Sequence, residues 1–75
     1  MMDVKILGES KESVNDGEYH TIFMLAEEYE TYLLIEQLFY GKRQATQTII
    51  MLSMTEARQL YGILKGLFDN EHFAV

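Results

Sequence analysis

The chain of 75 residues contains no cysteine. A disulfide framework and a thiolate metal site are therefore excluded, and the absence of cysteine suits a reducing compartment, where disulfides bring no advantage. The sequence also has no run of about 20 apolar residues that could span a membrane, and its N-terminus does not resemble a signal peptide. We therefore expect a soluble cytoplasmic protein with no membrane partner.

Sequence motifs that carry enzymatic chemistry are missing as well. There is no phosphate-binding glycine loop and no HExxH, GxSxG or EF-hand pattern. A metal site needs convergent ligands, and the two histidines, His20 and His72, are far apart in the chain. A domain this small also leaves little room for a substrate pocket. We expect no metal, no cofactor and no catalytic activity.

Basic residues are few and unevenly placed. The chain has 6 Lys and Arg against 12 Asp and Glu, a net charge of −6. Nine of the acidic residues fall within residues 1–36, which hold only two lysines. A negative field of this kind repels nucleic acid and anionic lipid and attracts basic protein surfaces. The same charge could also serve only to keep the surface solvated.

The composition that remains is that of one ordinary globular domain. At 48% hydrophobic and 24% charged residues the chain should fold, and we assign residues 1–75 to a single domain. A chain of this length buries only about 60% of the surface that its unfolded form exposes. Its stability on its own should therefore be marginal.

A C-terminal amphipathic helix is the clearest element. Apolar residues recur at three- and four-residue spacing from Ala57 to Phe68, on one side of a helix. Ser53 and Glu56 have the spacing of a capping box, which predicts a helix starting near Met54 and ending near Asp69. Residues 71–75 could form a frayed tail.

The preceding sequence predicts strands at residues 46–52, 31–39 and 19–25, with a weaker candidate at 4–7. Residues 31–39 could also be helical, but Gly41 suits the first central position of a type II′ hairpin turn and favours two antiparallel strands. The Asn15-Asp16-Gly17 sequence is a second turn signal. Residues 8–17 should be an exposed loop or a loose hairpin.

Together these elements predict an α+β fold, in which an antiparallel meander of three or four strands is followed by one C-terminal amphipathic helix packed on one face. The expected core consists of Ile50, Leu52, Ala57, Leu60, Leu64, Leu67 and Phe68. Residues 32–40 place apolar side chains on both faces of their strand, whereas the outer face of such a sheet should be polar. We therefore expect a homodimer, in which a second chain covers the surplus apolar surface.

Residues 46–68 resemble part of a known family. The run from Thr48 to Ala57, followed by Leu60 and Leu64, is similar to the last strand and C-terminal helix of the small positive-coactivator-type single-stranded-DNA-binding domains. The resemblance implies a curved sheet that binds the nucleic acid strand and a helix that builds a homodimer. It makes single-stranded nucleic acid an alternative partner, with Phe39, Tyr40, Lys42 and Arg43 as the candidate contacts.

The leading hypothesis is a protein-binding module without enzymatic activity. In size and charge the chain is similar to small acidic inhibitor proteins of phages and mobile elements, in which carboxylates imitate nucleic-acid phosphates or dock on a basic site. Glu27, Glu28 and Glu30 would steer a basic partner, and Tyr29 and Tyr32 would anchor it. Alternatively, the tyrosines only pack the sheet and the glutamates are only solvated.

Overall fold

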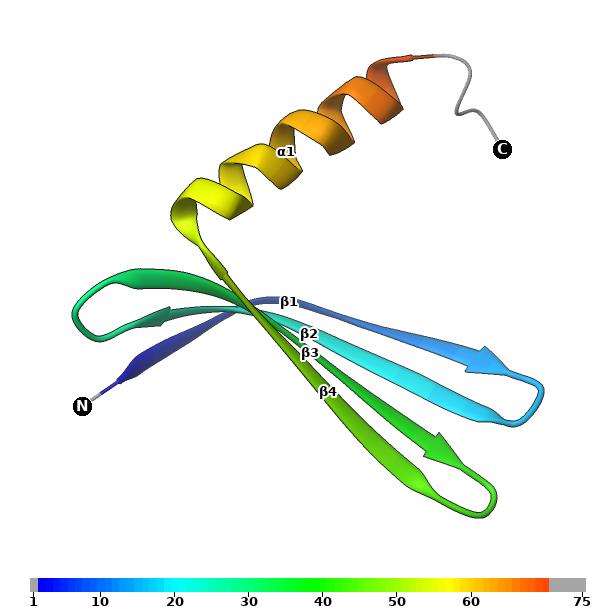
Figure 1. Ribbon diagram of the computed structural model, residues 1–75. Coiled ribbons are helices and arrows are strands. Elements are labelled where there is room, and N and C mark those ends of the chain that lie inside the picture. Colours follow the sequence, from blue (N-terminus) through cyan, green and yellow to red (C-terminus); the bar gives the residue numbers. More distant parts are fainter. Residues whose placement is uncertain (1, 71–75) are drawn as a thin grey trace.

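The fold is a four-stranded antiparallel sheet followed by one helix. The computed structural model describes residues 2–70, as β1 (Asp3–Val14), β2 (Gly17–Glu27), β3 (Thr31–Gly41), β4 (Ala45–Ser53) and α1 (Met54–Asp69) (Figure 1). Each strand pairs with the next, in the order β1-β2-β3-β4, and α1 packs against β3 and β4. The predicted α+β meander is confirmed, and residues 31–39 are a strand and not a helix.

The first hairpin contains residues 8–17, for which the sequence predicts an exposed loop or a loose hairpin. β1 continues through residues 8–14, and every residue from Gly8 to Val14 has a partner in β2. Val14 pairs with Gly17, so the turn falls at Asn15 and Asp16, as predicted. A shift in register between Ile6 and Gly8 introduces a β-bulge into this outer strand.

The second hairpin turn, between β3 and β4, differs from the predicted one. A type II′ turn requires a positive φ at its first central residue, and no glycine within residues 2–70 has one. Gly41 instead ends β3, and its N–H donates to the Gln44 carbonyl oxygen at 2.8 Å. Lys42, Arg43 and Gln44 form the connection between the strands.

Packing explains why glycine is needed at this end of the sheet. Gly17 of β2 pairs directly with Gly41 of β3, and the ring of Phe39 lies against both. A Cβ atom on Gly17 would be 2.8 Å from Phe39 Cε2, and one on Gly41 would be 2.9 Å from Phe39 Cε1. The two glycines therefore make room for the aromatic ring, and neither has to supply an unusual backbone angle.

The capping box at the start of α1 is present as predicted. The Glu56 backbone N–H donates to Ser53 Oγ at 3.2 Å, and the Ser53 N–H donates to Glu56 Oε1 at 3.0 Å. These two bonds satisfy backbone groups that the first turn of a helix leaves without partners. They fix the helix start at Met54, directly after β4. The predicted frayed tail, residues 71–75, lies outside the described residues.

The predicted core is wrong in one respect: none of its seven residues is fully buried. Ile50, Leu64 and Phe68 are exposed, while Leu52, Ala57, Leu60 and Leu67 are half-buried. Within residues 2–70 only Ala26 is a buried hydrophobic residue. The apolar positions of the helix were identified correctly, but α1 contacts only β3 and β4 and has no second layer over its apolar side.

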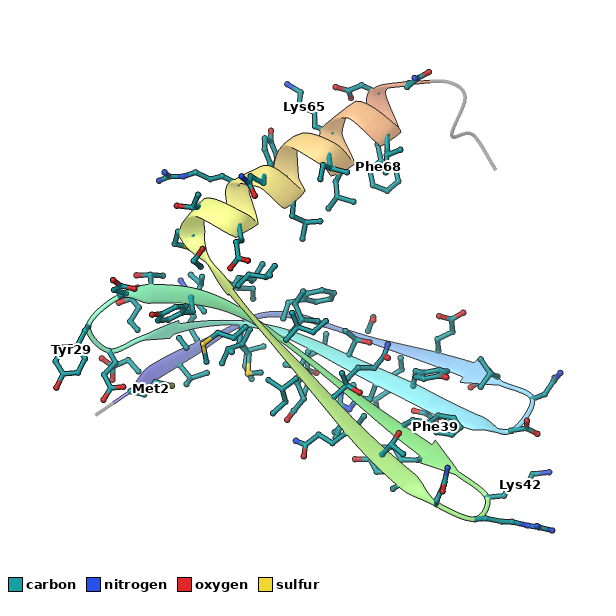
Figure 2. All side chains as sticks on the ribbon, viewed as in Figure 1. Met2, Tyr29, Phe39, Lys42, Lys65 and Phe68 are labelled. Atoms are coloured by element: carbon teal, nitrogen blue, oxygen red, sulfur yellow. The ribbon has the colours of Figure 1, made fainter. Side chains whose placement is uncertain are left out.

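The helix and the sheet together make a flat molecule. Its principal extents are 43 × 37 × 15 Å, and its radius of gyration is 15.0 Å, against about 11 Å for a compact domain of this length. Figure 2 shows Phe68 on the side of α1 nearer the sheet. Leu64 is 39% exposed and Phe68 is 73% exposed. The apolar side of the helix is therefore largely open.

Two glycine substitutions should have opposite effects on stability. In Gly17→Ala the new Cβ would overlap the Tyr40 carbonyl oxygen and crowd the Phe39 ring, so we expect a loss of about 1–3 kcal/mol. In Gly62→Ala nothing lies within 4 Å of the new Cβ, and the higher helix propensity of alanine should add up to about 1 kcal/mol. Urea unfolding measures both values. A neutral Gly17→Ala would contradict the packing described here.

Candidate partner-binding site

The five residues predicted to bind a protein partner lie together at one end of the sheet. Glu27 ends β2, Glu28, Tyr29 and Glu30 form the turn to β3, and Tyr32 is the second residue of β3. Asp3 pairs with Glu27 and adds a fourth carboxylate at the same end. We call these four carboxylates, with Tyr29 and Tyr32, the acidic end. The turn itself contains no basic residue.

The turn presents its side chains to solvent. Tyr29 is 96% exposed, and Figure 2 shows it projecting from the tip of the turn. Glu27, Glu28 and Glu30 are exposed too. The Glu28 N–H donates to the Glu30 carbonyl oxygen at 3.2 Å, which closes the backbone of the turn beneath Tyr29. The exposed Tyr29 ring thus lies at the tip of the turn, between Glu28 and Glu30 in the sequence.

Tyr32 differs from Tyr29 because it belongs to the sheet. It is half-buried and pairs with Ala26, the buried residue of β2. Its hydroxyl donates to Glu30 Oε2 at 2.8 Å. That hydrogen bond, and with it the negative charge of Glu30, raises the pKa of the Tyr32 phenol above its ordinary value. Tyr32 thereby orients Glu30 and connects the turn to the sheet.

Beside the turn is an open hollow of about 390 Å³. Its lining comes from three parts of the chain and consists of Met2, Ala26, Glu28, Tyr29, Glu30, Tyr32 and Met51. Sequence reasoning missed Met2 and Met51, which are 44% and 53% exposed. Methionine side chains adapt to irregular partner surfaces. The hollow therefore adds apolar contact area to a site that the sequence described mainly by its charge.

The residues predicted to contact nucleic acid lie at the opposite end of the sheet, and only some of them come together. Phe39, Lys42 and Arg43 line an open hollow of about 610 Å³, together with Asp16. Tyr40 is 52% exposed, but adjacent residues of a strand point to opposite faces, so it does not share the face of Phe39. The Phe39 ring packs on Tyr19, with 4.8 Å between ring centroids.

The described residues contain neither a cluster of metal-ligating side chains nor a membrane-spanning helix. Within residues 2–70 there is no group of three His, Cys, Asp or Glu side chains that could hold a metal ion. His20 Nε2 lies 3.9 Å from Glu9 Oε2. His72 is outside the described residues. No helix in this part of the chain is both long and apolar enough to cross a membrane.

Comparisons with known proteins add no assignment. No family model, no curated protein and no solved structure matches the chain. The similarity of residues 46–68 to the coactivator-type domains therefore stays a resemblance between residues.

The hydrogen bond between Tyr32 and Glu30 can be tested by titration. In Glu30→Gln the pKa of Tyr32 should fall toward its ordinary value, because the carboxylate that favours the protonated phenol is gone. The stabilisation from this bond should be present below the phenol's ordinary pKa and lost as the pH rises through the higher folded value. NMR of ring-labelled tyrosine measures the pKa. Glu28→Gln is the control, and an equal shift in both variants would contradict the assignment.

Proposed function

We propose that the protein is a non-enzymatic binding module that docks its acidic end on a basic surface of a partner protein. The observation that supports this proposal is the gathering of Glu27, Glu28 and Glu30 around the fully exposed Tyr29 in a single turn. Docking of this kind would suit an inhibitor that imitates nucleic-acid phosphates, as in the small acidic proteins of phages and mobile elements. A cytoplasmic location stays part of the same proposal.

The parts of the acidic end would have different tasks in docking. Exposed carboxylates act over a distance and mainly raise the association rate, whereas buried aromatic area slows dissociation. Tyr29 offers nearly its whole side chain for burial, and the adjacent hollow offers Met2 and Met51. Tyr32 would hold Glu30 in place through its hydroxyl. The site therefore combines steering with anchoring.

Single-stranded nucleic acid remains the second candidate because of the opposite end of the sheet. There the Tyr19 and Phe39 rings pack together, and Lys42 and Arg43 line the same hollow as Phe39. Binding of single strands normally combines stacking aromatics with a positively charged groove. Here, however, the negative charge of Asp16 lines the same hollow. The Phe39 ring already packs against Gly17 and Gly41. These two features favour docking by the acidic end over binding of single-stranded nucleic acid.

We also propose that the protein works as a homodimer. The chain exposes 6354 Å², whereas a compact protein of 8.8 kDa exposes about 4,800 Å². The excess, about 1,600 Å² per chain, falls in the range that each chain of an obligate dimer buries. Exposed apolar side chains in β4 and α1 account for part of this surface. Burial against a second copy would supply the core that one chain lacks.

The acidic end is tested by a triple variant with a matched control. Glu27→Gln, Glu28→Gln and Glu30→Gln together should slow association with a partner, identified by capture from lysate and mass spectrometry, about tenfold at low salt. The control, Glu12→Gln, Asp16→Asn and Glu18→Gln, makes the same charge change at the opposite end and should change the rate far less. Stopped-flow fluorescence measures both. Equal rates for the triple variant and the unmodified chain would reject the site.

Anchoring by the tyrosines gives a separate prediction about affinity. Tyr32→Ala should weaken binding more than any single Glu→Gln change, and Tyr32→Phe separates the ring from its hydrogen bond to Glu30. Calorimetry with the captured partner measures the difference. The second candidate is tested directly with a labelled oligonucleotide in fluorescence anisotropy. Micromolar or tighter binding at physiological salt would overturn docking on a basic protein as the leading proposal.

Self-association predicts a specific effect of the helix residue Leu64. Because Leu64 is 39% exposed in the single chain, Leu64→Ala should cost less than the roughly 2–5 kcal/mol of a buried leucine within that chain. It should instead weaken the dimer. Light scattering at tens of micromolar should give twice 8.8 kDa for the unmodified chain and a lower mass for Leu64→Ala. Lys65→Ala, at the next residue and about 100° around α1 from Leu64, is the control, and equal masses in all three would contradict the prediction.

A further inference from the structure

The two edge strands of the sheet are built differently. β1 carries charges along its length, at Asp3, Lys5, Glu9, Lys11 and Glu12, and it contains the β-bulge between Ile6 and Gly8. Charged side chains and bulges are the devices by which natural sheets prevent an edge from pairing with another strand. The β1 edge is therefore protected against such pairing.

The β4 edge has none of these devices. Its sequence, Ala-Thr-Gln-Thr-Ile-Ile-Met-Leu-Ser, has no charged residue and no proline, and its register with β3 runs without a bulge from Ser53 to Ala45. Every residue from Ala45 to Met51 is exposed. Ile49, Ile50 and Met51 are 56%, 48% and 53% exposed. A long, uncharged edge with an exposed apolar stretch at residues 49–51 is a surface on which another strand can pair.

We propose that β4 pairs antiparallel with β4 of a second copy of this chain, so that two sheets join into one continuous sheet of eight strands, four from each copy. This interface rests on the self-association proposed above and does not depend on docking by the acidic end. Of the four strands, β4 alone has no charged residue.

Charge identifies a second copy as the occupant of the edge. Two copies that each carry a net charge of −6 repel one another, so they can meet closely only where that charge is absent. β4 meets this condition, because it brings no like charges together when paired with itself. A basic partner would be drawn to the acidic end instead. The excess accessible surface of about 1,600 Å² per chain is also of the size that a stable dimer buries.

Pairing on a two-fold axis through Ile49, the central residue of β4, would place Ala45 of one copy opposite Ser53 of the other. The two-fold axis of an antiparallel pair is perpendicular to the sheet, so both α1 helices would rise from the same face. Their open apolar sides could then cover that face together. The turn containing Lys42 and Arg43 would lie next to the first helical turn of the other copy, which carries Glu56.

The chain lacks cysteine, so single cysteines report on this interface without background. Cysteines are placed one at a time at positions 47–51, and the chains are oxidised and separated on a non-reducing gel. Ile49→Cys should cross-link most efficiently, because on the axis the two Cα atoms are about 4.5–5.5 Å apart, within disulfide range. Efficiency should fall on either side of position 49. Ser10→Cys, in the exposed part of β1, should not cross-link.

A charged substitution supplies the second test. Ile49→Lys adds an edge charge at a residue that is 56% exposed, so it buries no charge within one chain, while the dissociation constant of the dimer should rise about tenfold or more. Ser10→Lys makes the same charge change on β1 and should leave the mass by light scattering unchanged. A monomeric unmodified chain would overturn both self-association and this interface. A dimer that keeps its mass in Ile49→Lys, or that cross-links through Leu64→Cys but nowhere in 47–51, would overturn the interface alone.

Discussion

The burial of apolar surface is the constraint on which the rest of this structure depends. A sheet has two faces, and residues 2–70 supply one helix, which contacts β3 and β4 only. β3 places apolar side chains on both faces, as a strand buried on both sides does. Yet among the described residues Ala26 alone is a buried hydrophobic residue. Backbone hydrogen bonds define the sheet, and the half-buried side chains of β2 and β3 supply the hydrophobic stabilisation within one chain, while much apolar surface stays exposed.

The distribution of charge separates two kinds of contact. The acidic end concentrates carboxylates at the β2–β3 turn, where they would attract a basic partner and repel another copy. β4 carries no charge at all, and it ends where α1 begins. Self-association through β4 and docking through the acidic end would therefore use surfaces that share only Met51, which belongs to β4 and lines the hollow beside the turn. One small chain could then form a stable dimer and still present an acidic turn on each copy.

Local signals in the sequence were sufficient for most of the fold. The capping box of Ser53 and Glu56 and the β-branched run before it predicted the strand-to-helix junction, because both depend on neighbouring residues. The turn at Gly41 was predicted wrongly, because glycine there makes room for Phe39, a reason that lies in packing across strands. Periodicity identified the apolar side of α1 but could not reveal whether another layer covers it. The hollow at the acidic end was missed because its methionines come from distant segments.

A second copy that completes the apolar surface of one chain would make unfolding depend on protein concentration, and this dependence tests the proposed dimer most directly. When folding and association are coupled, the unfolding midpoint shifts with concentration by mass action. Thermal unfolding followed by circular dichroism, over a hundredfold range of concentration, should show a midpoint that rises steadily with concentration. A midpoint that stays constant over that range, for a chain that sediments as a monomer of 8.8 kDa, would contradict the account.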